Sequence, residues 1–278
     1  MIKPLDCLFA AGILPALIAC SSPQDMGEEI AVEEGETAQS VLERRTAAGA
    51  KAVAFEDNAE SSGGGAREFA YGWPAQVSAI PALAEMLTAQ RDAALTAQKS
   101  EWEASLAEFA GEECISCTSR GFGKQWEVVA DLPRFLSLSA QSYIYSGGAH
   151  GNSDFDALVW DRESARAFTP AEMFASTAAL DTAVREDYCA ALEDERRERR
   201  GEYYSANDDV FGDCPGVEEL TVLVGSSTGR EFDRIGLLAA PYVAGAYAEG
   251  PYEVTLPVTA QILAAVRPEY RAAFAAPE

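Results

Sequence analysis

The chain contains one histidine, His150, which stands in the segment Tyr145-Ser146-Gly147-Gly148-Ala149-His150-Gly151-Asn152. Histidine is the usual side chain for proton transfer and metal binding near neutral pH. A zinc site needs three or four protein ligands, mostly His and Cys, and no second histidine is present to complete one. Ser146, His150 and either Asp154 or Asp156 could formally supply a catalytic triad, but Ser146 is not on a nucleophile elbow. We therefore predict no catalytic residue, no metal and no cofactor.

The side chains near His150 are better suited to contacting a ligand, because tyrosine combines an apolar ring with a polar hydroxyl. More tyrosines occur in the Gly- and Pro-containing loop 241–250. The candidate ligand-binding residues are His150, Tyr143, Tyr145, Asn152, Tyr242 and Tyr247. His150 also suits a structural role, in which its ring hydrogen-bonds the backbone of the glycine turn. A pair of carboxylates of the glycosidase type is neither indicated nor excluded, because 45 Asp and Glu offer too many pairs.

Several strands must position these residues. Residues 134–145 alternate in the way that a strand with two different faces does, and 154–160 could return as the second strand of a hairpin whose loop contains His150. Residues 67–73, 124–130, 219–224, 230–239 and 251–257 also read as strands. Segment 81–110 begins with proline and then lacks Gly and Pro, which predicts one long helix. Shorter helices are expected at 171–174, 178–199 and 259–266. The predicted class is α+β, with helices packed on antiparallel sheets.

The N-terminus predicts export. Residues 8–19 are apolar but too short to span a bilayer, and Leu17-Ile18-Ala19-Cys20 resembles a bacterial lipobox. We expect residues 1–19 to be a lipoprotein signal peptide and Cys20 to be the lipidated residue that attaches the protein to a membrane. Ser21 favours the outer membrane over the inner one, with the protein facing the periplasm. Residues 20–66 are rich in Glu, Gly and Ser, which predicts a disordered tether.

The remaining cysteines are expected to be oxidised outside the cytoplasm. Four of them can pair in three ways, and we predict Cys114–Cys117 and Cys189–Cys214 because each pair flanks one short irregular segment. The Cys-Ile-Ser-Cys spacing also occurs in redox motifs and in half of a zinc site. The net charge of −24 opposes binding to nucleic acid and suits either a solvated surface or a cationic partner.

Two sets of segments resemble a known envelope family. Phe69-Ala70-Tyr71-Gly72-Trp73-Pro74, followed by the long helix, resembles the small domain of peptidoglycan deacetylases of the PdaC type. Segments 145–152, 169–174, 241–245 and 250–254 resemble its partner domain of unassigned function, which also occurs in the lysozyme-sensing anti-sigma factor of the RsiV type. The resemblance implies a PdaC-like α+β domain at 67–140 and an RsiV-like α+β domain at 141–278.

The same resemblance sets the expected function. Deacetylases of this family bind zinc through an Asp and two histidines, and one histidine cannot build that site. We therefore expect a non-catalytic, lipid-anchored envelope protein that binds cell-wall glycan (peptidoglycan) or a cationic protein such as lysozyme. The alternative is a peptidoglycan-modifying hydrolase associated with deacetylation.

Overall fold

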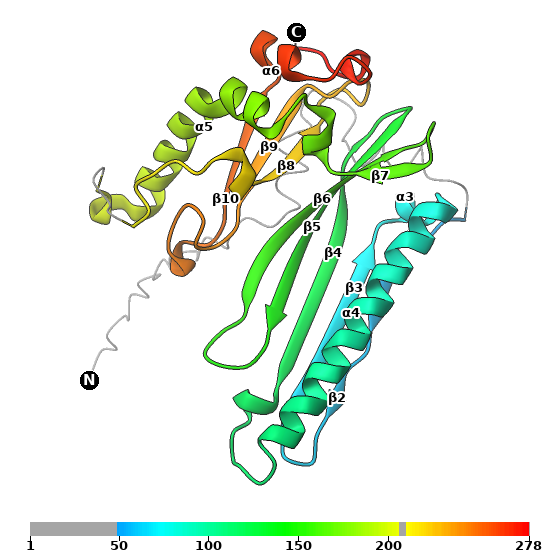
Figure 1. Cartoon of the computed structure of the whole chain (residues 1–278), viewed down its shortest axis with the longest axis vertical. Coiled ribbons are helices and arrows are strands. Elements are labelled where there is room, and N and C mark those ends of the chain that lie inside the picture. The colour runs from blue at the N-terminus through cyan, green and yellow to red at the C-terminus, as the bar shows by residue number, and fades with distance from the viewer. Residues whose placement is uncertain (1–48, 206–209, 278) are drawn as a thin grey trace, which may run out of the picture.

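The computed structural model describes residues 49–205 and 210–277, and it has the predicted α+β class. The predicted signal peptide 1–19 and lipidated Cys20 lie outside the described residues. Figure 1 shows the long helix α4 running alongside the strands of a large sheet, with a smaller sheet and the helix α5 toward the other end of the molecule. Among the described residues, no helix is both long and apolar enough to cross a membrane.

The larger sheet has the order β1-β3-β4-β5-β6-β7, with β2 paired to β3. Its strands are β1 (Val53–Glu56), β2 (Ala59–Glu60), β3 (Ala66–Trp73), β4 (Arg120–Asp131), β5 (Phe135–Tyr145), β6 (Asn152–Asp161) and β7 (Arg166–Phe168). The pair β3–β4 is parallel, whereas the sequence predicted antiparallel sheets. The reason is that the connection from β3 to β4 contains α4 (Pro81–Glu108), and a long crossover is what allows consecutive strands to run in parallel.

Helix α4 begins at Pro81, which has no N–H to lose at the first helical position. Leu83 and Leu87 of α4 are buried against one face of the sheet, where alternate residues of β3 supply Phe69 and Tyr71. These residues form a core with Trp73, Val77, Trp126, Leu136, Leu138, Ala140, Leu158 and Trp160. Because side chains alternate along a strand, the residues between them project from the opposite face, which α4 does not cover.

The C-terminal part has a three-stranded antiparallel sheet with the order β10-β9-β8. Its strands are β8 (Thr221–Gly225), β9 (Arg234–Ala239) and β10 (Tyr252–Pro257), and its helices are α5 (Thr177–Arg200) and α6 (Ala260–Ala265). Helix α5 buries Leu180, Val184, Tyr188 and Leu192, which are spaced by four residues, as one stripe in this core. Both predicted disulfides are present, and Cys189–Cys214 joins α5 to the segment that follows it.

Short helical segments fill several connections. They are α3 (Ala75–Ser78) and the 3₁₀ helices η1 (Ser116–Thr118), η2 (Pro170–Met173), η3 (Gly201–Tyr203), η4 (Val217–Glu219), η5 (Tyr247–Glu249) and η6 (Arg271–Ala273). Thr169 and Glu172 form a capping box at the start of η2, in which the Thr169 N–H donates to the Glu172 carboxylate over 2.7 Å.

A small apolar cluster joins the two sheets. Phe155 of β6 packs with Leu223 of β8 and Leu238 of β9, and the Thr221 hydroxyl donates to the Phe155 carbonyl over 3.1 Å. Strand β4 contributes Val129 at a bulge, where the register with β5 shifts between Val128 and Ala130. The bulge places one extra residue in β4. As a result the neighbouring residues Val129 and Ala130 both face the side of the sheet that packs against the C-terminal part.

Two predicted boundaries differ from the structure. The tether was expected to reach residue 66, but β1 and β2 lie within that range and pair with β3, because Val53 and Phe55 pack against the core beneath α4. The domain boundary expected between residues 140 and 141 falls inside β5. Strand β5 is hydrogen-bonded along its length to β4 and β6, so the sheet has no break at that point.

Asp161 at the end of β6 predicts an acid-sensitive contribution to stability. Its carboxylate is buried and accepts two hydrogen bonds from Arg134, and this pairing, against the opposing effect of burial, lowers its pKa from 3.8 to about 2. A pKa lowered by folding stabilises the protein above pH 4, and this stabilisation of about 2 kcal/mol is lost as the pH falls from about 4 toward 2. Asp161→Asn should therefore be less stable at pH 5 and converge with the parent near pH 2, as measured by urea unfolding. Glu163→Gln, at the exposed partner of Arg134, is the control, and parallel pH profiles for the parent and Asp161→Asn would contradict the prediction.

Candidate functional site

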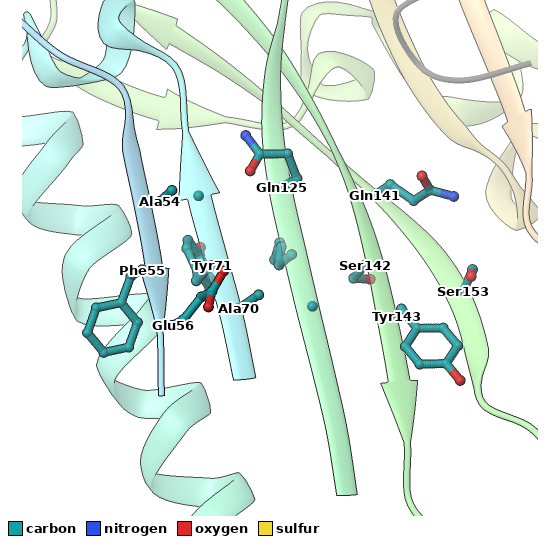
Figure 2. A pocket seen from close by; sticks show the side chains of 13 residues that line it. Ala54, Phe55, Glu56, Ala70, Tyr71, Gln125, Gln141, Ser142, Tyr143 and Ser153 are labelled. Carbon is teal, nitrogen blue, oxygen red and sulfur yellow. The ribbon is translucent and has the colours of Figure 1, made fainter. Parts of the chain in front are cut away.

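The face of the large sheet opposite α4 carries an open groove of about 430 Å³. It crosses β1, β3, β4, β5 and β6, as Figure 2 shows. An adjoining hollow shares Glu56, Ala70, Gly123 and Tyr143 with the groove and extends it to Asn58 and Glu68. We use "the groove" for both hollows together.

Small residues form the floor of the groove. Ala70 of β3 pairs with Gly123 of β4, and Ala54 of β1 pairs with Gly72 of β3. Gly72 has a packing reason, because a Cβ there would lie 2.2 Å from the Gln125 Oε1 and 2.9 Å from the Val53 carbonyl oxygen. Gly123 has no such reason: a Cβ would meet nothing within 4 Å, and its φ is not positive. The missing side chain at Gly123 therefore leaves open space rather than preventing a clash.

Polar side chains and the exposed ring of Tyr143 surround this floor. Gln125 pairs with Gln141, and Gly123 with Tyr143, which in turn pairs with Ser153. Figure 2 shows these side chains projecting from β4, β5 and β6 around the groove. Glu56 and Glu68 lie on the other side of the floor, on β1 and β3. The groove therefore offers amide, hydroxyl and carboxylate groups beside an aromatic ring.

The hairpin loop between β5 and β6 leaves the space that the Tyr143 ring occupies. A Cβ at Gly151 would lie 2.4 Å from the Tyr143 Cζ and 2.6 Å from the Ile144 carbonyl oxygen, so only glycine admits the ring there. Tyr143 remains 44% exposed. Tyr145 instead closes the loop, because its hydroxyl donates to the Gly148 carbonyl over 2.9 Å.

His150 lies in an exposed stack of aromatic rings that joins the hairpin loop to the C-terminal part. Its ring stacks on Tyr247 with centroids 4.0 Å apart, and Tyr247 lies 5.6 Å from Tyr242. The Nδ1 of His150 donates to the Gly151 carbonyl over 2.8 Å. Tyr242 is 52% exposed and has a φ of 74°, an uncommon conformation for a residue with a side chain. The structure thus brings together three of the predicted residues, and Gly151 joins them to Tyr143.

Asn152 does not belong to this arrangement. It pairs with Ile144, whereas its neighbour Ser153 pairs with Tyr143, so Asn152 faces the other side of the sheet. The sequence grouped Asn152 with the tyrosines because they are near each other in the chain, but alternation along β6 separates them.

The catalytic groups considered from the sequence are engaged elsewhere. Asp154 accepts a hydrogen bond from the Phe155 N–H, and Asp156 pairs with Lys124 over 2.7 Å. Within residues 49–205 and 210–277, no group of three or more His, Cys, Asp or Glu side chains is arranged to hold a metal ion.

Sequence reasoning missed most of the groove. The sequence did not predict four of the groove's polar residues, because their types are common on protein surfaces: Glu56, Glu68, Gln125 and Gln141. The available signal was the alternation of small residues, Ala70 with Gly72 inside the predicted strand 67–73 and Gly121 with Gly123 just before the predicted strand 124–130. Glycine inside a strand often marks a place where a ligand or another backbone approaches closely.

The comparison with family models addresses these same strands. Residues 64–153 match the model of the family described as "Deacetylase PdaC". The predicted PdaC-type resemblance is confirmed. The PdaC-type segment covers about a third of the chain and runs from β3 into β6, so it contains the glycine floor and Tyr143.

Two solved structures resemble the chain over a longer range. A DUF3298 family protein from Pseudomonas aeruginosa PAO1 matches with a TM-score of 0.48 and 13% identity, covering 78% of this chain and 94% of that one. A member of the DUF3298 family from Bacteroides fragilis matches with a TM-score of 0.40 and 16% identity, covering 74% and 89%. No curated protein matches the chain.

Proposed function

We propose that this protein is a non-catalytic module of the cell envelope that binds cell-wall glycan in the groove. In this proposal Cys20 carries the lipid that holds the protein at the outer membrane, facing the periplasm. The groove supports binding rather than a reaction, because its lining combines hydrogen-bonding side chains with the exposed ring of Tyr143 and includes no histidine.

The observation that carries the proposal is Gly123. It stands within the 12-residue strand β4, where glycine is unfavourable by roughly 0.5–1 kcal/mol relative to alanine. Neither its backbone conformation nor a neighbouring atom requires glycine. The absence of a side chain at Gly123 is explained if a bound molecule occupies the open space there.

The groups around the floor suit a sugar. A pyranose ring has an apolar face that can pack on Tyr143, and its hydroxyl groups can exchange hydrogen bonds with Gln125, Gln141 and Glu56. A cleft that combines an aromatic surface with a few placed polar groups is typical of small-molecule sites. The groove is open along the sheet and therefore suits a segment of a chain better than an enclosed small molecule.

The test compares two neighbouring residues of β5 on opposite faces. Tyr143 is 44% exposed and lines the groove, whereas Ile144 is 49% exposed and faces the other side. Calorimetric titration with soluble peptidoglycan fragments and N-acetylglucosamine oligomers should show binding that Tyr143→Ala weakens about tenfold, the effect of losing roughly 1.4 kcal/mol of ring contact. Ile144→Ala should bind as the parent does. No binding by the parent, or equal losses in the two variants, would refute the proposal.

A second candidate ligand is a cationic protein such as lysozyme. It is favoured by the net charge of −24 and by the side-chain carboxylates of Glu56 and Glu68, which have no hydrogen-bond or ion-pair partner among the described residues. Complementary charge accelerates and orients such association, and salt weakens it. Titration of the same two variants with lysozyme at low and high ionic strength tests this candidate; binding that salt does not weaken would count against it.

A further inference from the structure

We propose that the groove prefers glycans whose amino sugars carry free amines over glycans whose amino sugars are N-acetylated. This inference rests on the proposed glycan-binding function and names the class of glycan. It follows from the charges that face the floor of the groove.

Glu56 and Glu68 are close neighbours on the same face of the sheet. Glu56 on β1 pairs with Ala70 on β3, and Glu68 lies two residues before Ala70 on that strand. Such diagonal neighbours have Cα atoms roughly 7–8 Å apart, within reach of one bound sugar unit. Both side chains are exposed, and neither has a hydrogen-bond or ion-pair partner among the described residues. The two carboxylates therefore lie beside the floor, and no cation of the described residues neutralises their negative charge.

Among the residues that the structure describes, no positively charged side chain pairs with these two carboxylates in the groove. Lys124 is the one cationic residue among the described residues that line it. The Lys124 amine points to the other face, where it pairs with Asp156 over 2.7 Å and lies 5.0 Å from the centre of the Trp126 ring. Arg67, next to Glu68 in the chain, is likewise turned to the α4 side, where it pairs with Asp57. Alternation along β3 and β4 thus sends the cations to one face and leaves the acids on the other.

A ligand amine supplies the missing charge. A protonated amino group on a sugar that rests on Gly123 can reach a carboxylate and make a charge-assisted hydrogen bond. An N-acetyl group is neutral and gains no such contact, and a glycan carboxylate would be repelled. Charge complementarity therefore selects de-N-acetylated amino sugars within the class of glycans that the groove can hold.

The experiment compares a glucosamine tetramer with an N-acetylglucosamine tetramer by calorimetry at pH 6, using the whole protein. The glucosamine tetramer should bind about tenfold tighter, as two partly screened charge contacts allow. Glu56→Gln/Glu68→Gln should remove that preference, so that this variant binds the two tetramers with equal affinity. Glu101→Gln/Glu103→Gln changes the net charge equally, at exposed positions on α4 across the sheet, and should keep the preference.

The outcomes separate this inference from the function on which it rests. If both tetramers bind equally, if the acetylated one binds tighter, or if Glu56→Gln/Glu68→Gln keeps the preference, the inference is wrong and glycan binding stands. If the parent binds neither tetramer nor peptidoglycan fragments, the proposed function itself is wrong.

Discussion

A Gly123→Val variant is expected to lose glycan binding while unfolding at the same temperature as the parent or at a higher one. The valine Cβ has no atom within 4 Å and the backbone already has a conformation open to any residue, so no clash opposes it. Valine also favours a strand over glycine, by roughly 0.5–1 kcal/mol. The branched side chain would nevertheless stand on the floor between Ala70 and Tyr143 and occupy the place of the sugar.

Calorimetry for binding and thermal unfolding for stability together check this prediction. Gly72→Val is the matched control, because its Cβ would press on the Val53 carbonyl oxygen and should lower stability. A stable Gly123→Val protein that binds glycan as the parent does would show that the floor is not the binding surface. Marked destabilisation would show instead that Gly123 serves the fold.

Removal of the Cys189–Cys214 disulfide should have the largest effect on stability. The bond links residues 25 apart and so restricts the conformations of the unfolded chain, which stabilises the fold by about 3.5 kcal/mol on the chain-entropy model. The double variant Cys189→Ser/Cys214→Ser should lose about that amount in urea unfolding, and treatment of the parent with reductant should lower stability toward the same value. The bond also holds α5, whose buried stripe packs in the C-terminal core, to the segment that follows α5.

The other disulfide is the natural comparison. Cys114–Cys117 links residues only 3 apart, so Cys114→Ser/Cys117→Ser should cost about half as much. A cost for this pair equal to that of the longer link would contradict the loop-length argument.

The parts of the fold that depend on local pattern were predictable. Helix α4 was expected at 81–110 and spans 81–108, and β5 was expected at 134–145 and spans 135–145. In both cases one residue pattern persists over many residues and proline or glycine marks an end. The two disulfides followed from the short segments between their cysteines.

The site depended on pairings that no local pattern states. Tyr143 meets Gly123 only because β4 pairs with β5 in one register, and His150 meets Tyr247 across 97 positions of the chain. Strand β1 is four residues long and lies in the range 20–66, which is rich in Glu, Gly and Ser, so Val53 and Phe55 did not stand out. Glu56 and Glu68 become neighbours on one face of the sheet only because β1 pairs with β3.

Because of the bulge at Val129, the faces to which the residues of β4 point depend on the exact number of residues in the strand. On one side of it Gly123 and Gln125 face the groove, and on the other Ala130 faces the C-terminal core. Since neighbouring residues in a strand face opposite sides, loss of one residue between them would turn either the floor or Ala130 to the wrong face. A substitution in this strand leaves the direction of the other side chains unchanged. A single-residue insertion or deletion between Gly123 and Ala130 would instead turn one of these two residues away from the face that it needs.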